Sequence, residues 1–461
     1  MKKPTRAAVS RVMSEYGMLG VLLLLCLLFS ILTVREQHPG GSGAAEALFE
    51  NVTGVVPSSA RLLIVARETD EDRAFAFSLQ QLLLRDGYAP PSIITGDPAS
   101  VRAKLAAMAD SAIVIDLIFT THTNAPVVQA IKAQLVQFSE VDVVTPPARR
   151  WPTFLLPDNL RNVANQITVI AIIAIGMTMV IITAGIDLSV GSLIALSAVL
   201  TAWLVGKTGG ADATATAMLL ASLGGIVVCG ATGAFSGLMI TRFRIPPFIA
   251  TLAMMQVAAG VAYIISQGKP IYRLPDGFIW LGRGSDPLLK VPYAVILMFV
   301  LYIIAHVIMS RTAVGRHIYA VGGNPEAARL AGIRVRLVIF SVYAVCGMLA
   351  GLGGVIMASQ LKSGAPTYGL TYELYVIAAV VVGGTSLMGG EGRIFGTLIG
   401  AFVIGVVQNG MNLTNVETYT QKVVLGCIIL GAVLLDRLKQ QGFRLKWFRS
   451  LGPPGPRKKQ A

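Results

Sequence analysis

Long apolar stretches recur along most of the chain and are separated by short polar segments. A helix needs about 20 predominantly apolar residues to cross the hydrocarbon core of a bilayer. Ten stretches fit this requirement, near residues 16–34, 163–183, 190–206, 214–240, 246–266, 291–310, 337–360, 374–390, 394–413 and 421–438. Glycines interrupt the pattern between 374 and 413, where the count is least well defined. The pattern predicts an α-helical polytopic membrane protein with about ten transmembrane helices.

Residues 36–150 follow a different pattern, in which short β-type runs alternate with helical ones. The strands are predicted at Arg61–Ala66, Ser92–Thr95, Ala112–Leu117 and Val141–Val144, and the helices at Asp70–Asp86, Pro98–Met108 and Pro126–Gln134. This alternation predicts a small inserted α/β domain with a parallel sheet. A segment of about 100 residues can bury a core of its own.

These patterns divide the chain into four parts. They are an N-terminal tail with the first span (1–35), the inserted α/β domain (36–150), the main bundle (151–438) and a basic tail (439–461). The first apolar run follows a basic tract at residues 2–11, as in a signal peptide, but exceeds the usual apolar length of about 7–15 residues. Small residues at Gly40–Ala45 leave cleavage open as an alternative. We favour an uncleaved anchor.

The composition agrees with a membrane protein. Of the 461 residues, 54% are hydrophobic and 13% are charged, and the mean hydropathy is +0.68. Soluble domains are about 45–50% apolar and about 25% charged. The chain therefore has too little polar surface to cover a water-soluble globule.

Positive charge is concentrated on one side of the predicted membrane. Residues 35–150 hold ten Lys/Arg and thirteen Asp/Glu, which leaves +17 on the rest of a chain whose net charge is +14. With ten spans, the arginine-rich loops 241–245, 311–336 and 391–393 fall on the same side as both termini. The positive-inside rule places that side in the cytoplasm and the α/β domain outside. Since the basic residues lie in short tracts between apolar runs, they do not indicate nucleic-acid binding.

Two glycine-rich segments interrupt the apolar helices, at Ala184–Ser192 and at Gly383–Gly396. Their candidate residues for a substrate path are Asp187, Ser189, Gly384, Thr385 and Ser386. A carboxylate inside a membrane is costly, and paired breaks in transporter helices line substrate paths. The alternatives stay open: Asp187 or Ser189 caps the next helix in a short cytoplasmic turn, and the second segment is an unrelated turn.

The longest predicted cytoplasmic loop, 310–336, contains a short helix. Asn324 suits the N-cap, Pro325 the first helical position and Glu326 the positive end of the helix dipole. Gly332 is predicted to end the helix. A helix that lies along the membrane surface suggests a docking element, and a solvated amphipathic connector is the alternative.

Catalytic motifs are not found in the sequence. The closest approach to a phosphate-binding loop is Gly206-Lys207-Thr208, but Thr201 stands where the first glycine belongs. Neither acid–base nor metal-ligand spacing is found among the histidines His38, His122, His306 and His317. We interpret the cysteines as small core residues; they are Cys26, Cys229, Cys346 and Cys427. We therefore predict no enzyme, no metal and no cofactor in this chain.

Five strings between about residues 153 and 436 carry a family resemblance. In order, they are TFLLPDN, AIIAIGMTMVIITAGIDLSVGSLIALS, IPPFIATLAMM, GRHIYAVGGNPEAARLAGI and VVGGTSLMGGEGRIFGTLIGA. This part of the chain resembles the permease subunit of the ribose/monosaccharide class of ABC importers, within the branched-chain amino acid/sugar permease superfamily. The family has only a short connection where this chain carries about 115 residues.

The resemblance implies a bacterial inner-membrane permease that pairs with a second copy and works with three further components. Two of these are proteins, namely an ABC ATPase that carries ATP and Mg and a periplasmic or lipid-anchored sugar-binding protein, and the third is the surrounding membrane lipid. It implies a coupling helix at 324–332 that sits in a groove of the ATPase. The residues assigned to coupling are Gly322, Asn324, Glu326, Ala327, Ala328, Arg329 and Gly332. Asp187 and Ser189 match the family's GIDLSVGS signature.

Three questions remain open at this point. A membrane receptor with an extracytoplasmic sensor is one rival, although only 24 residues follow Arg437. A secondary transporter is another, although Asp187 is nearly alone as a buried acid. The cargo of an importer is a ribose-like monosaccharide or another small polar solute. For the insert, which resembles one lobe of a sugar-binding protein, a docking or spacer role is favoured over a complete binding domain.

Overall fold

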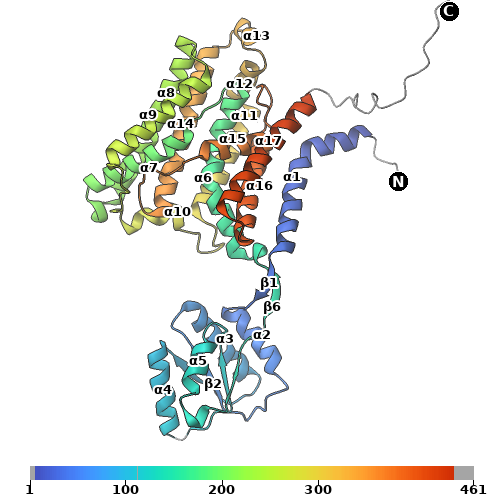
Figure 1. Cartoon of the computed structure of the whole chain (residues 1–461), viewed down its shortest axis with the longest axis vertical. Coiled ribbons are helices and arrows are strands. Elements are labelled where there is room, and N and C mark those ends of the chain that lie inside the picture. Colours follow the sequence, from blue (N-terminus) through green and yellow to red (C-terminus); the bar gives the residue numbers. More distant parts are fainter. Residues whose placement is uncertain (1–5, 112, 441–461) are drawn as a thin grey trace, which may run out of the picture. The chain divides into compact units, whose positions relative to one another are not determined.

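The computed structural model describes residues 6–111 and 113–440 (Figure 1). The chain forms two compact units, one from residues 34–153 and the other from the remaining residues. The predicted insert, 36–150, lies within the first unit. Most of the predicted basic tail lies outside the described residues.

The smaller unit contains a parallel sheet of four strands in the order β3-β2-β4-β5. The strands are β2 (Leu62–Ala66), β3 (Ser92–Thr95), β4 (Leu117–Thr120) and β5 (Asp142–Val144), and the helices are α2 (Gly41–Val52), α3 (Asp70–Arg85), α4 (Pro98–Asp110), α5 (Ala125–Lys132) and η1 (Val136–Phe138). All five residues of β2 are buried, as expected for a parallel strand covered on both faces. The predicted parallel sheet is confirmed.

Two hydrophobic clusters lie on the two faces of this sheet. Helices α2 and α3 contribute Leu48, Phe75 and Leu79 to one cluster. Helices α4 and α5 contribute Leu105 and Val128 to the other. The sheet is therefore the middle layer of an α/β/α sandwich with a core of its own.

Parts of this unit differ from the prediction. The strand expected at 112–117 begins only at Leu117, because the backbone N–H of Ile113 still bonds the Met108 carbonyl (3.1 Å) at the end of α4; residue 112 itself is not described. Helix α2 was not predicted, and its small residues Ala44 and Ala45 are fully buried against α3. A two-stranded antiparallel ribbon, β1 (Val34–Gln37) with β6 (Arg149–Pro152), was also not predicted.

The larger unit is a helical bundle (Figure 1). Its long helices are α1 (Arg6–Leu32), α6 (Pro157–Ile182), α7 (Val190–Lys207), α8 (Ala215–Phe243), α9 (Pro247–Ser266), α11 (Tyr293–Arg311), α14 (Val335–Leu361), α16 (Ile394–Leu413) and α17 (Thr418–Gln440). The shorter ones are η2 (Thr153–Leu155), η3 (Gly210–Asp212), η4 (Asp276–Ile279), α10 (Trp280–Arg283), α12 (Ala313–Gly323), α13 (Pro325–Leu330) and α15 (Tyr372–Val382).

Seven helices in the described part of the chain are long and apolar enough to cross a membrane: α6, α7, α8, α9, α11, α14 and α16. Shorter apolar helices cover the other three predicted spans, at Gly17–Leu32, Tyr372–Val382 and Thr418–Leu434. The span expected at 374–390 is corrected, since α15 ends at Val382 and the chain then leaves the helix. The structure therefore supports a polytopic helical membrane protein.

Helix α6 forms the centre of the bundle, and 89% of its most apolar window is buried. Side-chain hydrogen bonds join it to α16 near both ends, through Asn159 with Asn409 and through Thr178 with Thr397 (2.7 Å). Such bonds hold helices together where lipid supplies little hydrophobic drive. The interpretation of the cysteines is correct for Cys229 and Cys346, but Cys427 on α17 is exposed.

Candidate functional site

The bundle contains a cavity of about 160 Å³ between α6, α15, α16 and α17. Its lining residues are Gln166, Ile170, Tyr372, Tyr375, Gln408, Asn412 and Gln421. A cavity of about 150 Å³ accommodates a molecule the size of benzene, so this one has room for a single small ring. The lining is mostly polar and contains no charged side chain.

The polar groups of the cavity fall into two sets. Gln421 donates hydrogen bonds to the Asn412 side chain (2.8 Å) and to the Val416 carbonyl (2.9 Å), and so ties α17 to α16. By contrast, the structure has no side-chain hydrogen bond within the described residues for Gln166, Gln408, Tyr372 and Tyr375. Amides and phenols both donate and accept. These four groups can therefore bind the hydroxyls of a neutral solute.

The cavity residues were not predicted from the sequence. A signal was nevertheless present, because Gln166 and Gln408 stand inside long apolar runs. Polar residues within spans usually face the interior of a bundle. The sequence alone did not show which side of each helix faces the neighbouring helices.

The first break, residues 183–189, separates α6 from α7. Helix α6 ends at Ile182, Ala184 just beyond it is left-handed (φ 59°), and the Gly185 N–H bonds back to the Val180 carbonyl (3.0 Å). The chain then continues without helix through the interior, where the Ile186 carbonyl accepts a bond from the Tyr343 hydroxyl (3.3 Å) of α14. Because Asp187 is fully buried, this segment is not a solvated turn.

Asp187 fixes the end of the first break. Its Oδ1 accepts hydrogen bonds from the backbone N–H (2.9 Å) and the hydroxyl (2.6 Å) of Ser189. Ser189 is the N-cap residue of α7, but its own side chain makes no capping bond. The second carboxylate oxygen of Asp187 is buried and accepts no N–H or O–H hydrogen bond from the described residues, and the Cys346 thiol is the polar group beside this carboxylate. Buried polar atoms are normally bonded, so this oxygen has capacity for a further donor.

The second break, residues 383–393, follows α15 and begins with the same type of cap. Gly384 is left-handed (φ 87°), and the Thr385 N–H bonds the Val380 carbonyl (3.2 Å). Ser386 opens a turn whose ends are joined by a bond from its N–H to the Glu391 carbonyl (3.1 Å). The Thr385 hydroxyl is buried and has no partner in the described residues.

The structure does not bring the predicted path residues into the cavity. Asp187, Ser189, Gly384, Thr385 and Ser386 are all absent from its lining. They belong instead to the two breaks, which follow α6 and α15. Both helices line the cavity with residues nearer their N-terminal ends, namely Gln166 and Tyr372. The breaks and the cavity are thus different parts of the same helices.

Helix α13 has the ends expected from its sequence. The Asn324 side chain accepts the Ala327 N–H (3.0 Å), and Pro325 is the first helical residue. Gly332 is left-handed (φ 85°), and the following N–H, of Ile333, bonds the Ala328 carbonyl (3.0 Å). This pair of features is a Schellman ending. The local hydrogen-bonding signals therefore predicted both ends.

The surface of α13 is largely exposed. Ala328 is its buried residue and fixes it to the bundle. Glu326 and Arg329 form an exposed ion pair (2.8 Å) with each other. Leu330 is 84% exposed and was not among the predicted residues. A partner protein that covers this leucine would gain the free energy of burying its apolar surface.

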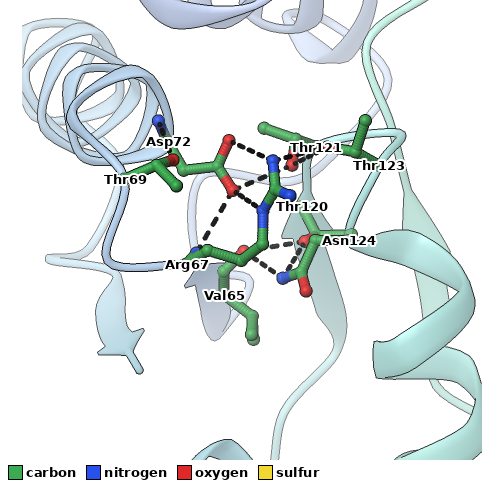
Figure 2. A network of polar contacts seen from close by, with 8 residues as sticks. All are labelled: Val65, Arg67, Thr69, Asp72, Thr120, Thr121, Thr123 and Asn124. Atoms are coloured by element: carbon green, nitrogen blue, oxygen red, sulfur yellow. Dashed lines mark hydrogen bonds and ion pairs between the residues drawn. The ribbon is translucent and has the colours of Figure 1, made fainter. Parts of the chain in front are cut away.

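The α/β unit contains a separate polar network at the ends of β2 and β4 (Figure 2). Asp72 is buried and pairs with Arg67 at 2.7 Å, which raises the pKa of the Arg67 guanidinium through the hydrogen bond to the carboxylate. Arg67 also donates to Thr123 (2.9 Å), and Thr121 lies at 3.3 Å from Asp72. Because both Asp72 oxygens have protein partners, we interpret the network as a structural clamp.

We predict that Asp72→Asn destabilises this unit by about 1–2 kcal/mol, the scale of a hydrogen-bonded charge whose partner is half exposed. In the variant, the side-chain NH₂ of the asparagine would face the guanidinium N–H groups of Arg67, and two donors cannot form a hydrogen bond with each other. Asp70→Asn is the matched control, since it also removes a negative charge from the first turn of α3 but is exposed. Thermal unfolding of residues 34–153 followed by circular dichroism tests this. Equal melting temperatures for the two variants would contradict the clamp.

Two other features of the unit have no ligand assigned. A groove of about 740 Å³ runs between α4 and α5 and is lined mainly by apolar atoms. The rings of His38 and His122 lie 3.4 Å apart between centroids. No cluster of three or more metal-ligating side chains is found among the described residues.

The chain belongs to the family described as branched-chain amino acid transport system / permease component, whose model matches residues 159–433. It is therefore a multi-pass membrane transport component. It is 44% identical over 293 residues to the ribose import permease protein RbsC of Escherichia coli K12, covering 63% of this chain and 88% of that protein.

Two further relatives extend this comparison. RbsC of Bacillus subtilis is 45% identical over 290 residues (62% of this chain, 87% of the relative). The D-allose transport system permease protein AlsC of Escherichia coli K12 is 38% identical over 285 residues (62% and 85%). No solved structure matches the chain.

Proposed function

We propose that the chain is the permease subunit of an ABC importer that carries a neutral monosaccharide across a bacterial inner membrane. The observation that carries this proposal is the cavity lined by amides and phenols without a charged residue. An amino acid is a zwitterion and would require charged or strongly polarised partners. The relatives named for ribose and allose agree with the uncharged lining.

The proposed topology has ten spans with both termini in the cytoplasm, so that residues 34–153 lie outside. Two copies of the chain form the path. A periplasmic or lipid-anchored binding protein delivers the sugar, and a separate ABC ATPase supplies the energy. The apolar helices and the arginine-rich loops support the spans and their orientation in this topology.

In this proposal, α13 is the coupling helix and docks into the ATPase. The residues assigned to coupling are Gly322, Asn324, Glu326, Ala327, Ala328, Arg329 and Gly332. The two breaks form part of the path, where Asp187 Oδ2 and the Thr385 hydroxyl bind the passing solute or its water. Their burial without N–H or O–H partners supports this role. The outer unit is a docking or spacer module, which the closed clamp at Arg67 and Asp72 supports.

Reconstitution tests the proposed function. The full chain is placed in liposomes with its partner ATPase and binding protein, and uptake of radiolabelled ribose, allose, arabinose and leucine is measured. We expect ATP-dependent uptake of at least one sugar and none of leucine. Uptake of leucine alone would contradict a sugar permease. A receptor would instead show binding by the outer unit without uptake of any of the four.

A further inference from the structure

Three backbone segments meet near α13 without any side chain between them. The Gly390 N–H of the second break donates to the carbonyl of Ile182, the last residue of α6 (2.8 Å). A Cβ added to Gly322 of α12 would overlap that carbonyl oxygen and lie 2.7 Å from the Gly390 nitrogen. We call the contact of Ile182, Gly322 and Gly390 the glycine junction.

The junction has a tightly constrained shape. Gly389 and Gly390 are both left-handed (φ 85° and 77°), and Ala184 of the first break is left-handed as well (φ 59°). A Cβ on Gly389 would lie 2.9 Å from the Ala184 Cβ and 3.0 Å from the Gly322 carbonyl. A left-handed alanine costs about 1 kcal/mol or more, so the packing around it must hold this conformation.

A second contact ties α12 to the second break. The Tyr319 hydroxyl donates to the Gly392 carbonyl (2.7 Å). Tyr319 and Gly322 are three residues apart in one helix and therefore share a face. This face of α12 is the one that meets the end of α6 and the second break.

The junction connects α13 with the cavity. A single residue, Asn324, separates α12 from α13. On the other side, Gln166 of the cavity and Ile182 of the junction lie 16 residues apart in α6, a distance of about 24 Å at 1.5 Å per residue. A displacement of α13 therefore reaches the ends of the cavity helices through direct backbone contacts, which are difficult to compress.

We infer that Gly322 is a positioning residue for transport: it holds α12 against the end of α6 and the second break, so that movement of the coupling helix is passed to both together. The inference rests on the proposed function for the source of that movement. The requirement for a residue without a side chain is specific to Gly322. At the adjacent Gly323, an added Cβ meets nothing within 4 Å.

Gly322→Ala with Gly323→Ala as control tests this inference, since both substitutions add one methyl group to the end of the same helix. The full chain is reconstituted with its ATPase and binding protein. We expect Gly322→Ala to lower uptake per ATP hydrolysed by about tenfold or more, within the usual range of coupling between sites, while ATP hydrolysis continues. Gly323→Ala should behave as wild type.

A second readout does not depend on the cargo. A water-soluble maleimide labels Gln408→Cys in the cavity, and the labelling rate with and without ATP is compared after subtraction of the parent protein's background. The response to ATP should be lost with Gly322→Ala and retained with Gly323→Ala. If the protein with Gln408→Cys and an intact Gly322 shows this response while the wild type takes up no sugar, the proposed cargo is wrong. In that case, loss of the response with Gly322→Ala still supports the junction.

Tyr319→Phe keeps the ring and removes only the hydroxyl that bonds Gly392. It replaces Gly322→Ala as the test variant if Gly322→Ala does not yield folded protein, as judged by size-exclusion chromatography. We expect a weaker ATP response of the maleimide labelling with Tyr319→Phe. A wild-type response in Tyr319→Phe, or in folded Gly322→Ala, would overturn the inference.

Discussion

Gln408→Leu is expected to reduce sugar uptake by about 100-fold, because the leucine cannot bond the sugar hydroxyl that the amide otherwise binds. A buried polar group left without its partner costs about 1–3 kcal/mol, and each 1.4 kcal/mol changes binding about tenfold. The amide of Gln408 has no protein partner among the described residues. Its removal should therefore affect the solute more than the stability of the bundle.

The experiment compares uptake in liposomes with binding of the ATPase to the same variant. Gln256→Leu on α9 is the matched control, since it makes the same change within an apolar helix away from the cavity lining. We expect Gln408→Leu to bind the ATPase normally but to require a much higher sugar concentration for uptake. Equal uptake by both variants would show that the cavity is not on the sugar's path.

Elements that depend on neighbouring residues in sequence were accessible to sequence analysis. The helix α13 is an example, since Asn324 caps one end with its own side chain and Gly332 forms the turn at the other. The apolar length of α6 or α14 is likewise a local property. In each case the deciding bonds or side chains lie within one segment.

Elements that depend on distant segments were not accessible. The start of β4 is set by its pairing with β2, where Leu62 lies opposite Leu117. The run Ile113–Val114 looks equally suitable for a strand, but it lies in the connection from α4.

The candidate site shows the same limitation more strongly. Gln166 and Gln408 line one cavity although they are 242 positions apart in the sequence numbering. At the glycine junction, the family resemblance selected Gly322 for coupling, but the sequence did not reveal its close contact with the Ile182 carbonyl and the Gly390 nitrogen, which the adjacent Gly323 lacks. Which side of a helix faces the interior, and what backbone lies against it, is decided by packing.

The exposed tip of α13 leads to the second large expected effect. We predict that Leu330→Asp weakens binding of the ATPase by about 100-fold, because full burial of a leucine side chain is worth about 1.5–3 kcal/mol and a buried unpaired carboxylate adds a further cost. Leu330 is 84% exposed in the chain by itself. The substitution should therefore leave the folded permease unchanged and act only where a partner covers this residue.

Leu288→Asp provides a close match for this test. Leu288 is 85% exposed, and it lies in the connection between α10 and α11, remote in sequence from α13. Both variants are purified in detergent, and the affinity of the ATPase is measured by surface plasmon resonance. We expect a loss of binding for Leu330→Asp and wild-type affinity for Leu288→Asp. Wild-type affinity for Leu330→Asp would mean that α13 is a solvated connector, which was the alternative left open by its sequence.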